Sequence, residues 1–133
     1  MKGLLRWLVC AMWLVEAGFA VAHEDQRSVL NEEQTLTGEV VAVFCYLMEG
    51  GFGTGREHAA GAQNCIRRGS PIAIKVGNQF YIVPVSDQGA LKNRLTQLAG
   101  QQVTARGIVT LRDGQLFMTI SHVERAKPKQ QDS

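Results

Sequence analysis

The sequence lacks a surplus of charge of one sign. It contains 14 Lys and Arg against 12 Asp and Glu, which gives a formal net charge of +2. Without residues 1–22, which have the pattern of a signal peptide, the chain has 14 − 2 = 12 basic and 12 − 1 = 11 acidic residues. Nucleic acids and anionic membranes are bound by clustered Lys and Arg. We therefore expect no nucleic-acid partner.

Long apolar runs are also lacking, except at the start of the chain. Residues 1–22 combine two basic residues, a mostly apolar stretch from Leu4 to Phe19 and a small-x-small end at Ala20–Ala22. This is the pattern of a secretory signal peptide. The apolar stretch contains Glu16 and is shorter than the roughly 20 residues of a membrane-spanning helix. We expect cleavage, no stable membrane insertion, and a periplasmic or secreted protein.

Cysteine is scarce, with three residues, of which Cys10 lies in the signal segment. Cys45 and Cys65 would then remain in an exported chain, where thiols are oxidised. We expect these two residues to form a disulfide. It would close a loop of about 20 residues and add roughly 3 kcal/mol to the free energy of unfolding.

The remaining 133 − 22 = 111 residues are enough for one domain with a hydrophobic core. Residues 23–36 are polar and acidic, which predicts a flexible lead-in. Residues 37–124 are expected to form the folded domain. Residues 125–133 are polar and are expected to form a disordered tail.

Hydrophobic periodicity and turn residues predict five strands and two helices in the domain. In chain order we expect a strand over Thr37–Met48, a helix over Arg56–Arg68, strands over Pro71–Val76 and Gln79–Val85, a helix over Ala90–Leu98, and strands over Gln102–Leu111 and Gln115–Val123. Gly77-Asn78 and Asp113-Gly114 are suited to the two hairpin turns. This order is that of the OB-fold, a five-stranded Greek-key barrel. We predict a mainly β protein with a helical insert after the first strand and a helix between the third and fourth.

Most side chains that could bind a metal or react lie between positions 45 and 65. Cys45-Tyr46-Leu47 is followed by a glycine-rich loop and then by His58-Ala59-Ala60-Gly61-Ala62-Gln63-Asn64-Cys65. This stretch resembles an uncharacterised family of small exported OB-fold-like bacterial proteins with the pattern C-Y-L … H-x-x-C-A-x-x-C. Gly61 stands where that family has a cysteine. The resemblance implies four potential soft ligands, of which this chain keeps Cys45, His58 and Cys65.

Cys45, His58 and Cys65 are therefore candidate ligands for copper or zinc, which thiolate and imidazole suit. Helical ligands of one ion usually lie three or four residues apart. Position 61 satisfies that spacing to both His58 and Cys65, and it is glycine. We expect the disulfide and no cofactor, with a copper or zinc site as the alternative.

No enzyme class is favoured by the remaining motifs. The glycine-rich loop lacks the Lys-Ser or Lys-Thr of a phosphate-binding loop. Cys65 lies late in its predicted helix, where the dipole disfavours a reactive thiolate. His122 shares its predicted strand face with Met118, which predicts a residue at the edge of the core; the alternative is a copper ligand together with Met118 and Met48.

We therefore expect a binding or assembly module and not an enzyme. OB-folds present a ligand groove across strands two and three, which would place Lys75, Gln79 and Tyr81 in the groove. The partner would be a small ligand or another exported protein. A metal-handling protein that uses Cys45, His58 and Cys65 is the alternative function.

Overall fold

The structure, a computed structural model, describes residues 31–86 and 89–128. The predicted signal peptide, residues 23–30 of the lead-in and residues 129–133 of the tail lie outside these ranges. The described helices, 3-10 helices (η) and strands are β1 (Glu32–Ala42), α1 (Val43–Glu49), η1 (Gly50–Gly53), η2 (Arg56–His58), α2 (Ala59–Arg67), β2 (Ile72–Val76), β3 (Gln79–Val83), α3 (Ala90–Gln97), β4 (Gln102–Arg112) and β5 (Gln115–Arg125).

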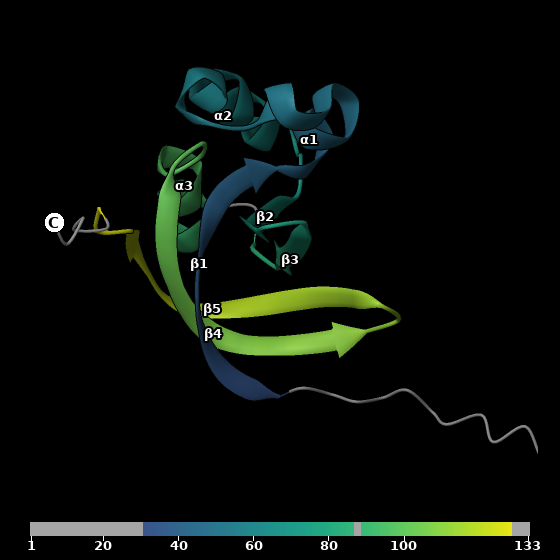
Figure 1. Ribbon diagram of the computed structural model, residues 1–133, viewed down its shortest axis with the longest axis vertical. Helices are drawn as coiled ribbons and strands as arrows, with labels where there is room; N and C mark the ends of the chain where they lie inside the picture. Colours follow the sequence, from purple (N-terminus) through teal and green to yellow (C-terminus); the bar gives the residue numbers. More distant parts are fainter. Residues whose placement is uncertain (1–30, 87–88, 129–133) are drawn as a thin grey trace, which may run out of the picture.

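The five strands form a closed barrel in the order β1-β2-β3-β5-β4 (Figure 1). Neighbouring strands are antiparallel except β3 and β5, which are parallel. β1 closes the barrel because its residues Glu32–Glu39 pair with β4 and its residues Glu39–Ala42 pair with β2. The predicted OB-like barrel is confirmed, with helices after β1 and between β3 and β4.

The hairpin turns are those that the sequence predicts. Asp113 and Gly114 both have positive φ, 50° and 77°, as a two-residue type I′ turn requires. Gly77 also has a positive φ of 56° in the turn between β2 and β3. The turns fix the strand registers, so that Val76 pairs with Gln79 and Arg112 with Gln115.

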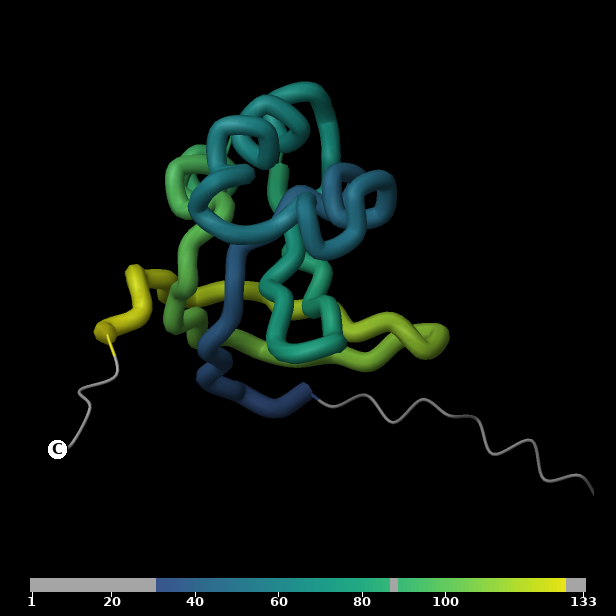
Figure 2. Tube along the Cα trace, turned by 45° about the horizontal axis from the view of Figure 1, so that its top comes forward, coloured from purple at the N-terminus to yellow at the C-terminus, as the bar shows by residue number. Residues whose placement is uncertain are grey.

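The hydrophobic core fills the barrel and extends under the helices. Strand residues such as Ile74, Val109 and Met118 are completely buried and belong to the same cluster as Ile66 of α2 and Leu95 of α3. The helices gather at one end of the barrel, as Figures 1 and 2 show from two directions. They cover the end of the core that the strands leave open. Within the described ranges, no helix is both long and apolar enough to cross a membrane.

The first strand differs from its prediction at both ends. It begins at Glu32, so the last residues of the predicted lead-in are strand residues paired with β4. It ends at Ala42 and not at Met48, and residues 43–49 form α1. Beyond Ala42 the backbone N–H groups leave the sheet: Val43 donates to the carbonyl oxygen of Pro71 and Phe44 to Ser70 Oγ. Leu, Met and Glu in this segment are good helix formers. The sequence predicts a strand here because the segment is apolar on both faces, a pattern that also fits a strand covered on both sides.

β2, β3 and β4 differ from their predicted bounds by one or two residues, and β5 differs in the faces of its side chains. The pairing register with β4 shifts between Arg106 and Gly107, so that Arg106 pairs with His122 and Gly107 with Ile120. A β-bulge of this kind reverses the alternation of faces beyond it. His122 is therefore exposed, whereas Met118 is buried in the core. The predicted placement of His122 on the face of Met118 is wrong for this reason. β5 also continues to Arg125, the first residue of the predicted tail.

Met118 and Met48 provide a matched test of this packing, because Met118 is 0% exposed and Met48 is 85% exposed. Met118→Ala should lower the free energy of unfolding by about 2–5 kcal/mol, since it leaves a cavity in the barrel. Met48→Ala should change it by less than about 0.5 kcal/mol. Urea denaturation followed by circular dichroism measures both, and equal effects of the two substitutions would contradict this core.

Candidate functional site

The predicted disulfide is present between Cys45 and Cys65. Cys45 is a buried residue of α1 and Cys65 is a residue of α2. The bond therefore joins two helices of the insert. The predicted strand Thr37–Met48 includes Cys45 and would have made this a bond between a strand and a helix; it is not, because the chain leaves the sheet at Val43.

A buried hydroxyl holds the start of α1. Ser70 is 5% exposed, and its Oγ accepts a hydrogen bond from the N–H of Phe44 and donates one to the carbonyl oxygen of Pro71. Helix starts leave unpaired N–H groups, and here a side chain from the end of the insert satisfies one. Together with the disulfide, this contact attaches α1 to the segment that leads into β2.

His58, the third candidate metal ligand, is the N-cap residue of α2. Its Nδ1 lies 3.5 Å from Oε2 of Glu49, and its side chain is 18% exposed. Its Nε2 is buried and has no hydrogen-bond partner in the part of the chain that the structure describes. The ring packs over Gly61, because a Cβ at that position would lie 2.9–3.4 Å from ring atoms. Position 61 therefore does face the imidazole, as the helical spacing suggested.

The three candidate ligands are not arranged as a metal site in this structure. Both sulfur atoms are bonded to each other, so neither is a thiolate. Among the described residues, no group of three or more His, Cys, Asp and Glu side chains is placed to hold an ion. The alternative of a copper or zinc site would require the reduced protein.

The predicted groove residues lie on two different faces of the sheet. Lys75 pairs with Phe80 across the β2–β3 hairpin, whereas Tyr81 pairs with Ile74. Side chains of a strand alternate between faces, so Lys75 and Phe80 point outward while Tyr81 packs against the core beside Ile74. Gln79 shares the face of Tyr81 and accepts a hydrogen bond from its hydroxyl. The three residues do not form one surface.

The outer face of this hairpin is continued by the side chain of Tyr46 from α1. The rings of Tyr46 and Phe80 are 4.7 Å apart at an interplanar angle of 64°, the edge-to-face arrangement that aromatic pairs favour. Lys75 Nζ lies 5.7 Å from the centre of the Tyr46 ring. The two-residue turn at Gly77-Asn78 fixes this register, so the pairing of Lys75 with Phe80 can be read from the sequence.

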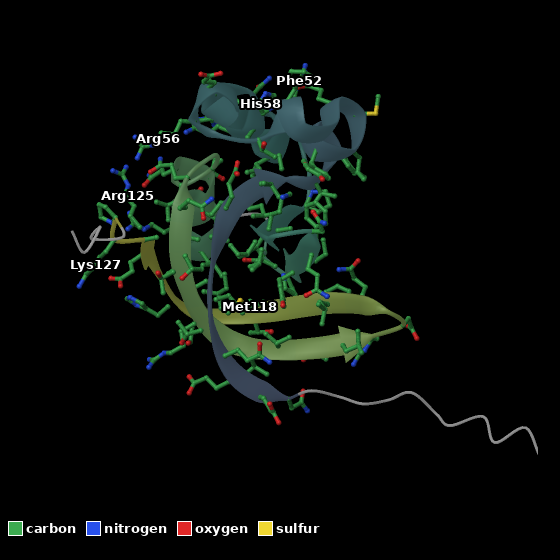
Figure 3. All side chains as sticks on the ribbon, in the orientation of Figure 1. Phe52, Arg56, His58, Met118, Arg125 and Lys127 are labelled. Carbon is green, nitrogen blue, oxygen red and sulfur yellow. A yellow bond between two sulfur atoms is a disulfide. The ribbon has the colours of Figure 1, made fainter. Side chains whose placement is uncertain are left out.

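Large apolar side chains are exposed on α1 and η1. Phe44, Leu47 and Met48 of α1 and Phe52 of η1 are 53%, 69%, 85% and 89% exposed, respectively. Positions 44, 47 and 48 have the spacing i, i+3, i+4 and therefore share one face of α1. Phe52 lies at the helical end of the molecule (Figure 3). We call these four residues the apolar surface; gathered exposed apolar residues are typical of interaction sites.

Comparison of the chain with protein-family models, curated proteins and solved structures finds no match.

Removal of the disulfide should destabilise the insert. Replacement of both Cys45 and Cys65 by Ser should lower the free energy of unfolding by about 3 kcal/mol, because the unfolded chain regains the freedom of a 20-residue loop. The wild-type protein in reductant should show the same loss, which controls for the substitutions themselves. Equal unfolding midpoints in urea for the oxidised and reduced wild-type protein would contradict a stabilising role.

Proposed function

We propose that this chain is an exported binding module without catalytic activity, and that it recognises a partner protein through its apolar surface. The observation that carries the proposal is the exposure of four large apolar side chains on α1 and η1. Single exposed apolar residues are ordinary, but a group of them on one helix and the turn that follows is not. A partner would remove these side chains from water.

The position of the apolar surface supports the proposal. Its helix follows β1, and Tyr46 of the same helix contacts Phe80 on the outer face of β3. OB-folds commonly bind their ligands on strands two and three and on the loop between strands one and two. This placement on the fold is an analogy with other OB-folds, since fold alone does not fix function. It agrees with the independent evidence of exposure.

The side chains of the apolar surface favour a protein partner. Met and Leu adapt their shape to a partner, and aromatic residues are enriched in interface cores. The disulfide agrees with a periplasmic or secreted location, since disulfides persist in oxidising compartments.

The proposal is tested by placing a photo-crosslinking amino acid at Phe52, with Thr119 on β5 as the exposed control position. In cells that export the protein, crosslinks to one partner should form from position 52 and not from position 119. Leu47→Ser together with Met48→Ser should reduce the crosslinked fraction at least tenfold, because it removes apolar contact area. Ile108→Ser, a change of the same kind on β4, should leave it unchanged. Equal crosslinking from both positions would contradict the proposal.

A metal-handling function is the second candidate, and the state of His58 favours it. Its Nε2 is buried without a hydrogen-bond partner among the residues described. Such an atom lowers the stability of the fold unless a ligand, such as a metal ion, binds to it. The ring packs over Gly61, whose carbonyl oxygen lies 3.9 Å from Cys45 Sγ. Reduction of the disulfide would add two thiolates in this part of the insert, a donor set suited to copper or zinc.

Thiol counting and elemental analysis of the purified mature protein distinguish the two functions. The binding module should contain no free thiols and no stoichiometric metal. The metal-handling protein should contain two free thiols and one bound ion, which His58→Ala should remove and His122→Ala should not. His122 is the control because it is exposed on β5, away from both cysteines in the sequence.

A further inference from the structure

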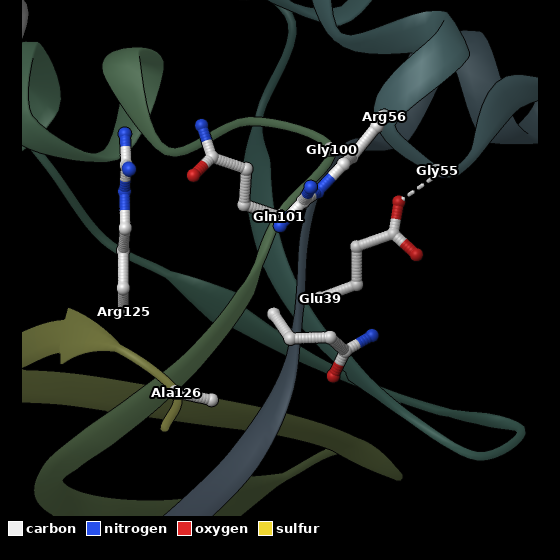
Figure 4. A pocket seen from close by; sticks show the side chains of 8 residues that line it. Glu39, Gly55, Arg56, Gly100, Gln101, Arg125 and Ala126 are labelled. Carbon is white, nitrogen blue, oxygen red and sulfur yellow. Dashed lines mark hydrogen bonds between the residues drawn. The ribbon is translucent and has the colours of Figure 1, made fainter. Parts of the chain in front are cut away.

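Two arginines from distant parts of the sequence border a hollow beside the start of the insert. Arg56 begins η2 and Arg125 ends β5. Both line a cavity of about 250 Å³, together with Glu39 of β1, Gln102 of β4 and the turn residues Gly100 and Gln101. An adjoining cavity of about 330 Å³ is lined by Arg56, Gln101 and Arg125 again. Figure 4 shows the side chain of Gln101 between those of the two arginines.

Among the residues that the structure describes, no ion pair neutralises the positive charge of this hollow. Within residues 31–86 and 89–128, neither Arg56 nor Arg125 has a hydrogen-bond or ion-pair partner. The one carboxylate among the lining residues is that of Glu39, and its Oε1 accepts a hydrogen bond from the N–H of Gly55. Two guanidinium groups facing one hollow without a counter-ion favour the entry of an anion.

The walls of the hollow are fixed by backbone contacts. Gly100 donates its N–H to the carbonyl oxygen of Val40, and Val40 donates to that of Gln101. Ala126, next to Arg125, donates to the carbonyl oxygen of Gln102. These bonds tie the β1, β4 and β5 sides of the hollow together.

The segment that carries Arg56 is fixed as well. Gly100 has a φ of 75°, and a Cβ on it would lie 2.6 Å from the carbonyl oxygen of Gly55, so the two segments touch at this point. Glu39 holds the N–H of Gly55 from the other direction (Figure 4). The backbone at Arg56 is therefore held against the barrel, which lowers the conformational entropy that a ligand would have to remove.

We propose that this hollow binds a small oxyanion carrying two negative charges, of the phosphate or dicarboxylate type, between Arg56 and Arg125. Guanidinium groups form paired, charge-assisted hydrogen bonds with oxygens of such groups. The volume of about 250 Å³ is enough for a compact anion of this kind. The exposed carboxamide of Gln102 can donate a further hydrogen bond.

This site is separate from the apolar surface of the proposed function. Arg56 and Arg125 lie on one side of the molecule and Phe52 at its helical end (Figure 3). Lys127 lies on the side of the two arginines and adds to their positive potential. A failure of either proposal would leave the other intact.

The test is a titration of the isotopically labelled protein with inorganic phosphate and, separately, with succinate, followed by NMR at constant ionic strength, with chloride as the reference anion. At least one dianion should shift the amide signals of Gly55, Arg56 and Gln101 in a saturable manner, with a Kd of about 1 mM or lower. The dianion with the lower Kd identifies the type of oxyanion. Shifts that do not saturate with either dianion would overturn the proposal.

Three substitutions and a control assign the binding to the hollow. Arg56→Gln and Arg125→Gln should each raise the Kd by about tenfold or more, because each removes a charge-assisted contact. Glu39→Gln should lower the Kd, since it removes the one negative charge and keeps an oxygen that accepts from Gly55. Arg112→Gln, an exposed arginine near the β4–β5 turn, should have no effect. Unchanged binding in either of the first two variants would overturn the assignment.

Discussion

The double pairing of β1 is the constraint on which the structure depends. Its first eight residues pair with β4 and its last four with β2, and Glu39 belongs to both sets. A strand that bridges two others in this way removes the open edges that a five-stranded sheet would otherwise expose. The side chain of Glu39 extends outward from this junction and holds Gly55 of the insert. Glu39 therefore takes part both in closing the barrel and in positioning η2.

The insert between β1 and β2 carries the apolar surface and Arg56. Its attachment to the barrel explains how it holds these side chains in place. Val43 and Phe44 hydrogen-bond to Pro71 and Ser70, so the beginning and the end of the insert are held together. The disulfide then joins its two α-helices. A segment stabilised by these bonds can leave apolar side chains in water, because its fold does not rely on burying them.

The sequence predicts the elements whose signals are local. The Asp113-Gly114 turn requires only two residues with positive φ, and the Cys45–Cys65 pair follows from counting the cysteines that remain if the predicted signal peptide is removed. Other features depend on the register between strands or on contacts across the fold. The bulge that turns His122 outward leaves no periodic trace, and the change from strand to helix at Val43 occurs within a continuous apolar run. The hollow between Arg56 and Arg125 exists only once the barrel has brought η2 to the end of β5.

The separation of the two proposed sites follows from the path of the insert. The chain leaves β1 through α1, which lies against the outer face of β3 through Tyr46 and Phe80. It returns along the other side through η2, which lies against Gly100 and the start of β4. One insert therefore borders two different sides of the barrel. The disulfide fixes α1 relative to α2, and α2 continues directly from η2. A ligand on either side of the barrel therefore binds a surface whose geometry is already set. This lowers the entropic cost of binding at both proposed sites.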